Sequence, residues 1–215
     1  MTDTIAQLLA AAVARDPARP LLTWYDDATG ERTELSGATL ANWVAKTANL
    51  LVDGIGFGPG DRAAVLLPPH WQTAAVLLGC WAAGGSVTVG PPEPVEVLFS
   101  APDQIDQSAE WPAGERYATA LAPLAAPLRQ VPPGFTDYVV DVRAYGDQFP
   151  AYQGGGPQDA DLCVRAARRA AEAGIGVDDR VLVDTARHPD PVDWLLAPLA
   201  AGATVVACGN ANPDR

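Results

Sequence analysis

An internal repeat constrains the fold of this chain more than any other feature of its sequence. Residues 61–89 align without gaps with residues 179–207, and ten of the 29 aligned positions are identical. Each copy opens on Asp-Arg, continues as a short apolar run and a segment of helical length, and ends on Ala-Ala-Gly before a second apolar run. This order is typical of a βαβ unit with parallel strands, in which the glycine caps the helix. The sequence predicts two related βαβ units; the alternative is two unrelated units in an alanine-rich chain.

Local patterns predict further elements on both sides of the first copy. Apolar spacing predicts a helix that begins near Ile5 and ends before Pro17, and a second helix that follows Ser36 as its N-cap. Between them, a turn cluster separates two runs that suit a hairpin. The segment 101–148 shows no clear periodicity over most of its length. The remaining predictions are strands at Leu21–Tyr25, Glu31–Leu35, Val95–Phe99 and Tyr138–Val142, and a helix at Asp161–Ala173.

Composition excludes several classes of function. The chain has 215 residues and a net charge of −12, so it repels phosphodiesters and nucleic acid is not an expected partner. Its longest apolar stretch, near residues 74–85, is too short for a membrane span, so no membrane partner is expected either. Residue Asp3 and the lack of early positive charge do not suit a signal peptide, which favours a cytoplasmic location.

Cysteine and histidine usage predicts no metal centre. The three cysteines, Cys80, Cys163 and Cys208, are widely spaced and lie among apolar or helical residues. This pattern suits buried free thiols in a reducing compartment rather than disulfides. Only two histidines are present, so a zinc site of cysteines and histidines is not expected.

The glycines at residues 54–60 do not form a dinucleotide-binding fingerprint. That fingerprint follows a strand and opens a helix, whereas these glycines follow a predicted helix and precede a predicted strand. They are interpreted as helix-cap and turn glycines. The chain also lacks the G-x-S-x-G, G-x-x-x-x-G-K-[ST] and H-E-x-x-H motifs, and no catalytic residue is predicted from such patterns.

Two long stretches carry a family resemblance: TELSGATLANWVAKTANLLVDGIGFGPGDRAAVLLPPHWQTAAVLLGCWAAGGSVTVGPP and GIGVDDRVLVDTARHPDPVDWLLAPLAAGATVVACG. They resemble the N-terminal part of the AMP-binding, adenylate-forming acyl-CoA synthetases, and within that similarity a group of short actinobacterial proteins. The order and spacing of the pieces carry the resemblance. It implies an α/β fold of two packed subdomains, similar to a truncated N-terminal domain of these enzymes. Subdomain A would span about 57–177, and subdomain B about 1–56 together with 178–215.

The resemblance also shows which chemistry the residues lack. The family holds ATP phosphates in a loop rich in serine and threonine that closes on a lysine. The corresponding residues 149–159 keep the glycines Gly154, Gly155 and Gly156 but contain no serine, threonine or lysine. The single lysine of the chain, Lys46, falls in an early helix where the family has no catalytic lysine. ATP, AMP or coenzyme A are the cofactors that the resemblance implies, and the changed loop argues against them.

Two places remain as candidate ligand-binding residues. A run of three glycines can present N–H groups to an anion, so Gly154, Gly155 and Gly156 are candidates, although a flexible loop is the simpler reading. The resemblance places His188 at a strand end that borders the acyl and adenine pocket. Its repeat mate His70 also precedes a helix, so helix capping is an alternative role for both.

Three functions stay open at this point. The first is a non-catalytic relative of the synthetases that binds a small adenylate or acyl ligand between its subdomains. The second is a dimeric interaction or regulatory scaffold without a small-molecule ligand, because homodimers are the commonest oligomers. The third is an adenylate-forming ligase that a partner chain completes by donating a lysine, which rests on analogy alone.

Overall fold

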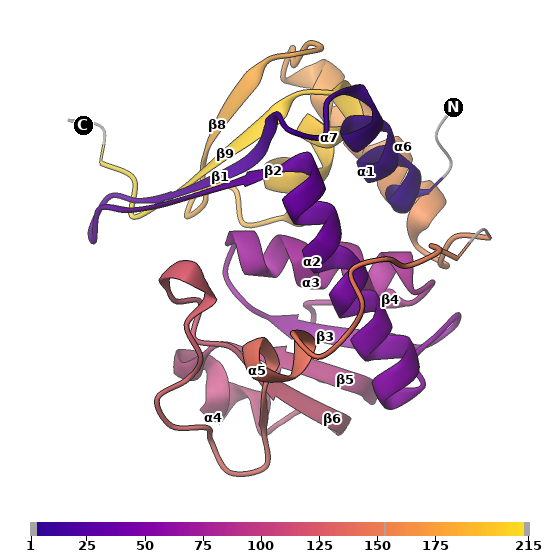
Figure 1. The fold of residues 1–215 in the computed structure, drawn as a ribbon, viewed down its shortest axis with the longest axis vertical. Helices are drawn as coiled ribbons and strands as arrows, with labels where there is room; N and C mark the ends of the chain where they lie inside the picture. Colours follow the sequence, from indigo (N-terminus) through magenta and orange to yellow (C-terminus); the bar gives the residue numbers. More distant parts are fainter. Residues whose placement is uncertain (1–3, 153, 213–215) are drawn as a thin grey trace.

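The computed structural model describes residues 4–152 and 154–212, in which nine strands form two sheets (Figure 1). The first sheet has the order β2-β1-β9-β8, and the second has the order β4-β3-β5-β6-β7. All neighbouring strands run parallel except the hairpin of β1 and β2. The strands are β1 (Pro20–Asp26), β2 (Glu31–Ser36), β3 (Arg62–Leu66), β4 (Ser86–Thr88), β5 (Val95–Ser100), β6 (Ala113–Ala118), β7 (Thr136–Asp137), β8 (Arg180–Asp184) and β9 (Thr204–Gly209).

Helices cover these sheets and join them. The longer helices are α1 (Ile5–Arg15), α2 (Gly37–Asn49), α3 (Trp71–Ala82) and α6 (Asp159–Glu172). The short segments are η1 (Leu50–Gly54), η2 (Pro102–Gln104), α4 (Ile105–Ser108), η3 (Pro123–Ala125), α5 (Tyr138–Val142), η4 (Val192–Leu196) and α7 (Ala197–Ala201). Among the described residues, no helix is both long enough and apolar enough to cross a membrane.

The two βαβ units predicted from the repeat are present, one in each sheet. Strand β3 pairs in parallel with β4, and β8 pairs in parallel with β9. The same hydrogen bonds recur in each copy. Asp61 Oδ2 accepts from Gly58 N at 2.8 Å, and Asp179 Oδ2 accepts from Gly176 N at 2.7 Å. The glycine after each helix has a positive φ, +83° at Gly84 and +74° at Gly202. This confirms the predicted α/β fold with an internal repeat.

Helix α3 lies between the two sheets, packed along α2 (Figure 1). Every residue of α3 is buried, which explains why its sequence is apolar on all sides rather than on one stripe. Gly79 permits the close approach of the two helices, because a Cβ at that position would lie 2.6 Å from Thr47 Cγ2. The central helix thus belongs to the cores of both sheets.

The ends of the chain share one sheet. Strand β1 pairs in parallel with β9, from Leu22 beside Val205 to Asp26 beside Gly209. The long helix that precedes β8, α6, packs on α7 and η4 of the second repeat copy. The subdomain boundaries proposed at about 57 and 178 stay a prediction.

The segment Tyr138–Val142 is a helix, and the predicted strand there is wrong. The side chain of Asp137 caps it, with Oδ1 accepting from Val139 N at 2.8 Å and from Val140 N at 3.2 Å. Tyr138, Val139 and Val142 are buried while Val140 is 59% exposed, as one face of a helix requires. The capping aspartate and this one-sided burial outweigh the strand preference of the β-branched residues. Strands β6 and β7, also in the region 101–148, have no periodic signal in the sequence.

Candidate functional site

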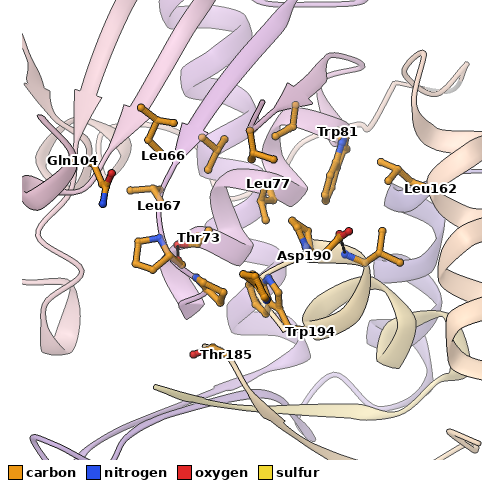
Figure 2. Close-up of a pocket in the computed structure, with 18 of the residues that line it drawn as sticks. Leu66, Leu67, Thr73, Leu77, Trp81, Gln104, Leu162, Thr185, Asp190 and Trp194 are labelled. Carbon is orange, nitrogen blue, oxygen red and sulfur yellow. Dashed lines mark hydrogen bonds between the residues drawn. The ribbon is translucent and has the colours of Figure 1, made fainter. Parts of the chain in front are cut away.

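A cavity of about 800 Å³ opens where the two repeat copies face each other (Figure 2). Its walls come from separate parts of the chain: the end of β3 and the loop after it, α3, β4, η2 and α4, α6, and the segment from the end of β8 into η4. The lining residues are Val65, Leu66, Leu67, Pro68, Pro69, Thr73, Leu77, Trp81, Val87, Val89, Asp103, Gln104, Gln107, Gln158, Leu162, Arg165, Thr185, Ala186, Pro189, Asp190, Pro191, Val192 and Trp194.

Most of this wall is apolar. Leu77, Trp81 and Trp194 line it and are buried in the core. These side chains gather around the same space in Figure 2, with Leu162 of α6 beside them. Large apolar walls with a few polar groups are typical of small-molecule pockets.

Among the described lining residues, the one basic side chain is already paired with acidic ones, and Asp103 adds a further carboxylate. Arg165 lies 3.4 Å from Asp190 and 3.8 Å from Asp161. The cavity therefore offers no unpaired cation to a phosphate among its described residues. This arrangement favours an uncharged or weakly charged ligand.

Most of the other polar lining groups also have partners inside the protein. Thr185 Oγ1 donates to Cys208 O at 3.0 Å. The amide of Gln158 pairs with the backbone of Val87 in both directions, accepting from its N–H at 2.9 Å and donating to its carbonyl at 3.0 Å. Within the described chain, the side-chain amides of Gln104 and Gln107 have no hydrogen-bond partner in the protein. These two side-chain amides, together with the carboxylate of Asp103, are the lining groups left to hydrogen-bond a ligand.

The glycine run lies outside the lining of this cavity, and a carboxylate of the protein accepts from one of its N–H groups. Asp159 Oδ2 accepts from Gly156 N, while Asp159 Oδ1 accepts from Ile5 N at 2.8 Å. Gly155 N donates to Tyr152 O at 3.2 Å. This internal carboxylate lies beside the glycine run and repels an anionic ligand there. The proposal of Gly154, Gly155 and Gly156 as ligand-binding residues stays a prediction.

Close packing accounts for the third glycine. A Cβ at Gly156 would lie 2.7 Å from the carbonyl oxygen of Gly85 and 3.0 Å from that of Gly84. A Cβ at Gly154 would instead meet the ring of Tyr152, a half-exposed side chain, at 3.0 Å. The backbone carbonyls that crowd position 156 cannot move easily, whereas the tyrosine ring beside position 154 can.

We therefore expect Gly156→Ala to lower the free energy of unfolding by about 1–3 kcal/mol, because the new methyl group overpacks two backbone carbonyls. Gly154→Ala, the matched control in the same loop, should cost less than about 1 kcal/mol. Urea denaturation of both variants measures the difference. Equal losses would show that contact with Gly84 and Gly85 is not what requires glycine at position 156.

The two repeat histidines differ in role. His70 caps α3, its Nδ1 accepting from Gln72 N at 3.2 Å, so the capping interpretation is correct there. At the second copy the cap is Asp190, whose Oδ1 accepts from Val192 N at 2.8 Å. His188 is partly exposed, with Nδ1 3.7 Å from Asp193 Oδ2, and it is not among the lining residues. Its neighbours Pro189 and Asp190 do line the cavity, and a ligand role for His188 itself stays a prediction.

Sequence reasoning did not single out the residues that build this cavity. Leu77, Trp81 and Trp194 have the apolar spacing of core residues, and nothing in the sequence separates a cavity wall from a filled core. Gln158 lies two residues after the glycine run, and its position there was the one available signal. Within the described residues, no group of three histidine, cysteine or acidic side chains is arranged to hold a metal ion.

Comparisons with known proteins place this chain in a family. A profile described as AMP-binding enzyme matches residues 9–93. A "TIGR03089 family protein" of Mycobacterium tuberculosis is 42% identical over 225 residues, which covers 99% of this chain and 92% of that relative.

Solved structures with the same fold come from larger synthetases. The acetoacetyl-CoA synthetase from Streptomyces lividans aligns with a TM-score of 0.75 at 21% identity, covering 98% of this chain and 39% of its own. The N-terminal domain of FACL13 from Mycobacterium tuberculosis aligns with a TM-score of 0.66 at 16% identity, covering 95% of this chain and 56% of its own. The chain thus spans between two fifths and three fifths of these structures, and at such identities the likeness shows the fold alone. The chain belongs to the same family as the "TIGR03089 family protein" of Mycobacterium tuberculosis, and it has the fold of acyl-CoA synthetase N-terminal domains.

Proposed function

We propose that this protein binds an acyl or aromatic small molecule in the cavity between its two repeat copies and does not activate it with ATP. The observation that carries the proposal is the largely apolar cavity of about 800 Å³, whose one arginine is already paired with acidic side chains. A ligand with an apolar body and an uncharged polar end fits this wall, with Gln104 and Gln107 as the hydrogen-bonding groups.

Two further observations support binding without adenylation. The carboxylate of Asp159 accepts from Gly156 N and from Ile5 N, so a negative charge of the protein itself lies beside the glycine run. Lys46 is on α2 and donates a hydrogen bond to the carbonyl of Tyr145, away from the cavity lining. ATP-dependent acyl activation needs a positive group at the developing charge, and the cavity offers none that is unpaired.

Calorimetric titration tests the proposal directly. Medium-chain fatty acids, aromatic acids and the amides of both should be compared with ATP, AMP, coenzyme A and a non-hydrolysable acyl-adenylate analogue. We expect saturable binding of the amides, weaker binding of the acids because their carboxylates are charged, and none of ATP. Release of pyrophosphate from ATP in the presence of a carboxylic acid would contradict the non-catalytic part, and absence of binding by every acid and amide would contradict the ligand part.

A cavity-filling variant tests whether the ligand binds in this cavity. Leu162 lines the cavity from α6, whereas Val164 on the same helix is 67% exposed and does not line it. We expect Leu162→Trp to weaken ligand binding at least about tenfold, because the indole occupies space that the ligand needs. Val164→Trp adds the same side chain outside the cavity and should leave the affinity unchanged. Equal affinities of the two variants would place the binding site elsewhere.

A further inference from the structure

Strand β8 forms a free edge of the first sheet, next to β9 (Figure 1). In this parallel ladder Thr204 N donates to Asp179 O at 2.8 Å, and Thr185 N donates to Cys208 O at 3.1 Å. Odd-numbered residues of β8 therefore direct their backbone groups to β9. Because such groups alternate along a strand, those of Arg180, Leu182 and Asp184 point away from the sheet.

The other sheet edges are blocked or short in the described chain. The amide of Gln158 pairs with both backbone groups of Val87 and so covers β4. Strand β7 has two residues, and β2 carries charged side chains, among them Arg32 and Glu34. These are the usual means by which proteins protect a sheet edge. Strand β8 instead presents Leu182, which is 72% exposed.

The sequence of β8, Arg-Val-Leu-Val-Asp, complements itself when it is reversed. Antiparallel pairing centred on Leu182 sets Leu182 opposite its own copy and Arg180 opposite Asp184 of the second chain. The backbone groups of all three positions point outward, so they coincide with the hydrogen-bonded pairs of such a ladder. At Asp184 the carbonyl also accepts from Arg187 N at 3.2 Å and His188 N at 3.1 Å in the turn after the strand, so the pairing there rests on its N–H group. Their side chains also share one face of the sheet, since strand side chains alternate.

The charges at the two ends of β8 have no ion-pair partner in the described part of the chain. Among the described residues, Arg180 forms no ion pair, whereas its repeat mate Arg62 pairs with Glu93. Asp184 accepts a hydrogen bond from Ala186 N at 3.1 Å but has no basic partner in the described chain. A second copy supplies both missing partners through a two-fold axis.

We propose that two copies of this protein associate through antiparallel pairing of their β8 strands, which joins two four-stranded sheets into one of eight strands. The pairing combines backbone hydrogen bonds, the contact of two Leu182 side chains, and two symmetry-related pairs of Arg180 with Asp184. The dimer proposal does not depend on the ligand proposal, because it rests on the free backbone edge of β8 and not on the cavity.

Sedimentation equilibrium over a concentration series tests the dimer. The wild-type protein should show an apparent mass that rises toward twice that of the monomer. We expect Arg180→Glu or Asp184→Lys alone to weaken association at least about tenfold, since each change puts like charges opposite each other twice per dimer. The double variant with both changes restores opposite charges and should recover most of the wild-type affinity.

A second pair of variants keeps the test informative if Asp184→Lys disturbs the turn after β8. Leu182→Lys places two ammonium groups opposite each other at the axis and should abolish the dimer. Val164→Lys removes an exposed valine of similar exposure from α6 and should not affect it. Hydrogen exchange should also show the Leu182 amide becoming protected as the protein concentration rises. A wild-type protein that stays monomeric at every concentration, or equal effects of Leu182→Lys and Val164→Lys, would overturn the proposal.

Discussion

Asp159→Ala should lower the free energy of unfolding by about 2–4 kcal/mol, because it leaves the buried N–H of Ile5 and the part-buried N–H of Gly156 without an acceptor. The Asp159 side chain is buried, and its two oxygens accept from Ile5 N and Gly156 N. One carboxylate thus joins the start of α1, the glycine loop and the start of α6. Its negative charge at the first turn of α6 also interacts favourably with the positive end of the helix dipole.

Asp161→Ala is the matched control for this change. Asp161 is in the same first turn of α6, but its side chain is 73% exposed and its one ion pair, with Arg165, spans 3.8 Å. We expect a loss of about 0.5 kcal/mol or less, as for other exposed ion pairs. Urea denaturation with a common baseline measures both variants. Similar losses in the two would show that the buried carboxylate does not hold the three segments together.

The second large effect is a pH dependence that arises from His70. Burial lowers the pKa of His70 to about 3, because the ring is enclosed between Trp24 and Trp71 in the core. In the unfolded chain the pKa of the group is near its ordinary value of 6.5. Between these values the unfolded state binds a proton that the folded state does not bind. The stability is complete above about pH 6.5 and falls by about 1.4 kcal/mol for each pH unit below it, until the pH reaches the folded pKa.

His70→Asn removes this titration and keeps a side-chain acceptor for the cap of α3. From pH 6.5 to pH 5 we expect the wild-type protein to lose about 2 kcal/mol more stability than the variant loses. His188→Asn, which replaces the other histidine of the chain at a partly exposed position, is the control. Denaturant unfolding at several pH values above the carboxylate range provides the measurement. Parallel curves for the wild-type protein and His70→Asn would exclude His70 as the cause.

The repeat was predictable because its signals are local. Asp61 and Asp179 each cap a glycine turn three residues away, and Gly84 and Gly202 each take a positive φ at a helix end. Such interactions lie within a few residues of each other, so the sequence alone carries them. The family resemblance rested on the same segments, and the fold it implied is the one observed.

The candidate site was predictable only in part, because it depends on contacts between distant segments. Asp159 accepts a hydrogen bond from Ile5 N, 154 residues away in the sequence, and no local pattern near either residue predicts that contact. The same contact decides that the glycine loop holds an internal carboxylate. Local glycine spacing suggested an anion site there and could not show that the protein supplies the negative charge itself.

Short local patterns therefore determined the two βαβ units, their caps and the acidic character of this protein. Tertiary packing decided the rest, namely the helix at Tyr138–Val142, the cavity wall and the free edge of β8. The physical reason is that burial and strand order depend on which segments meet in space. An apolar side chain such as Leu77 or Trp194 looks the same in the sequence whether it fills a core or lines a cavity.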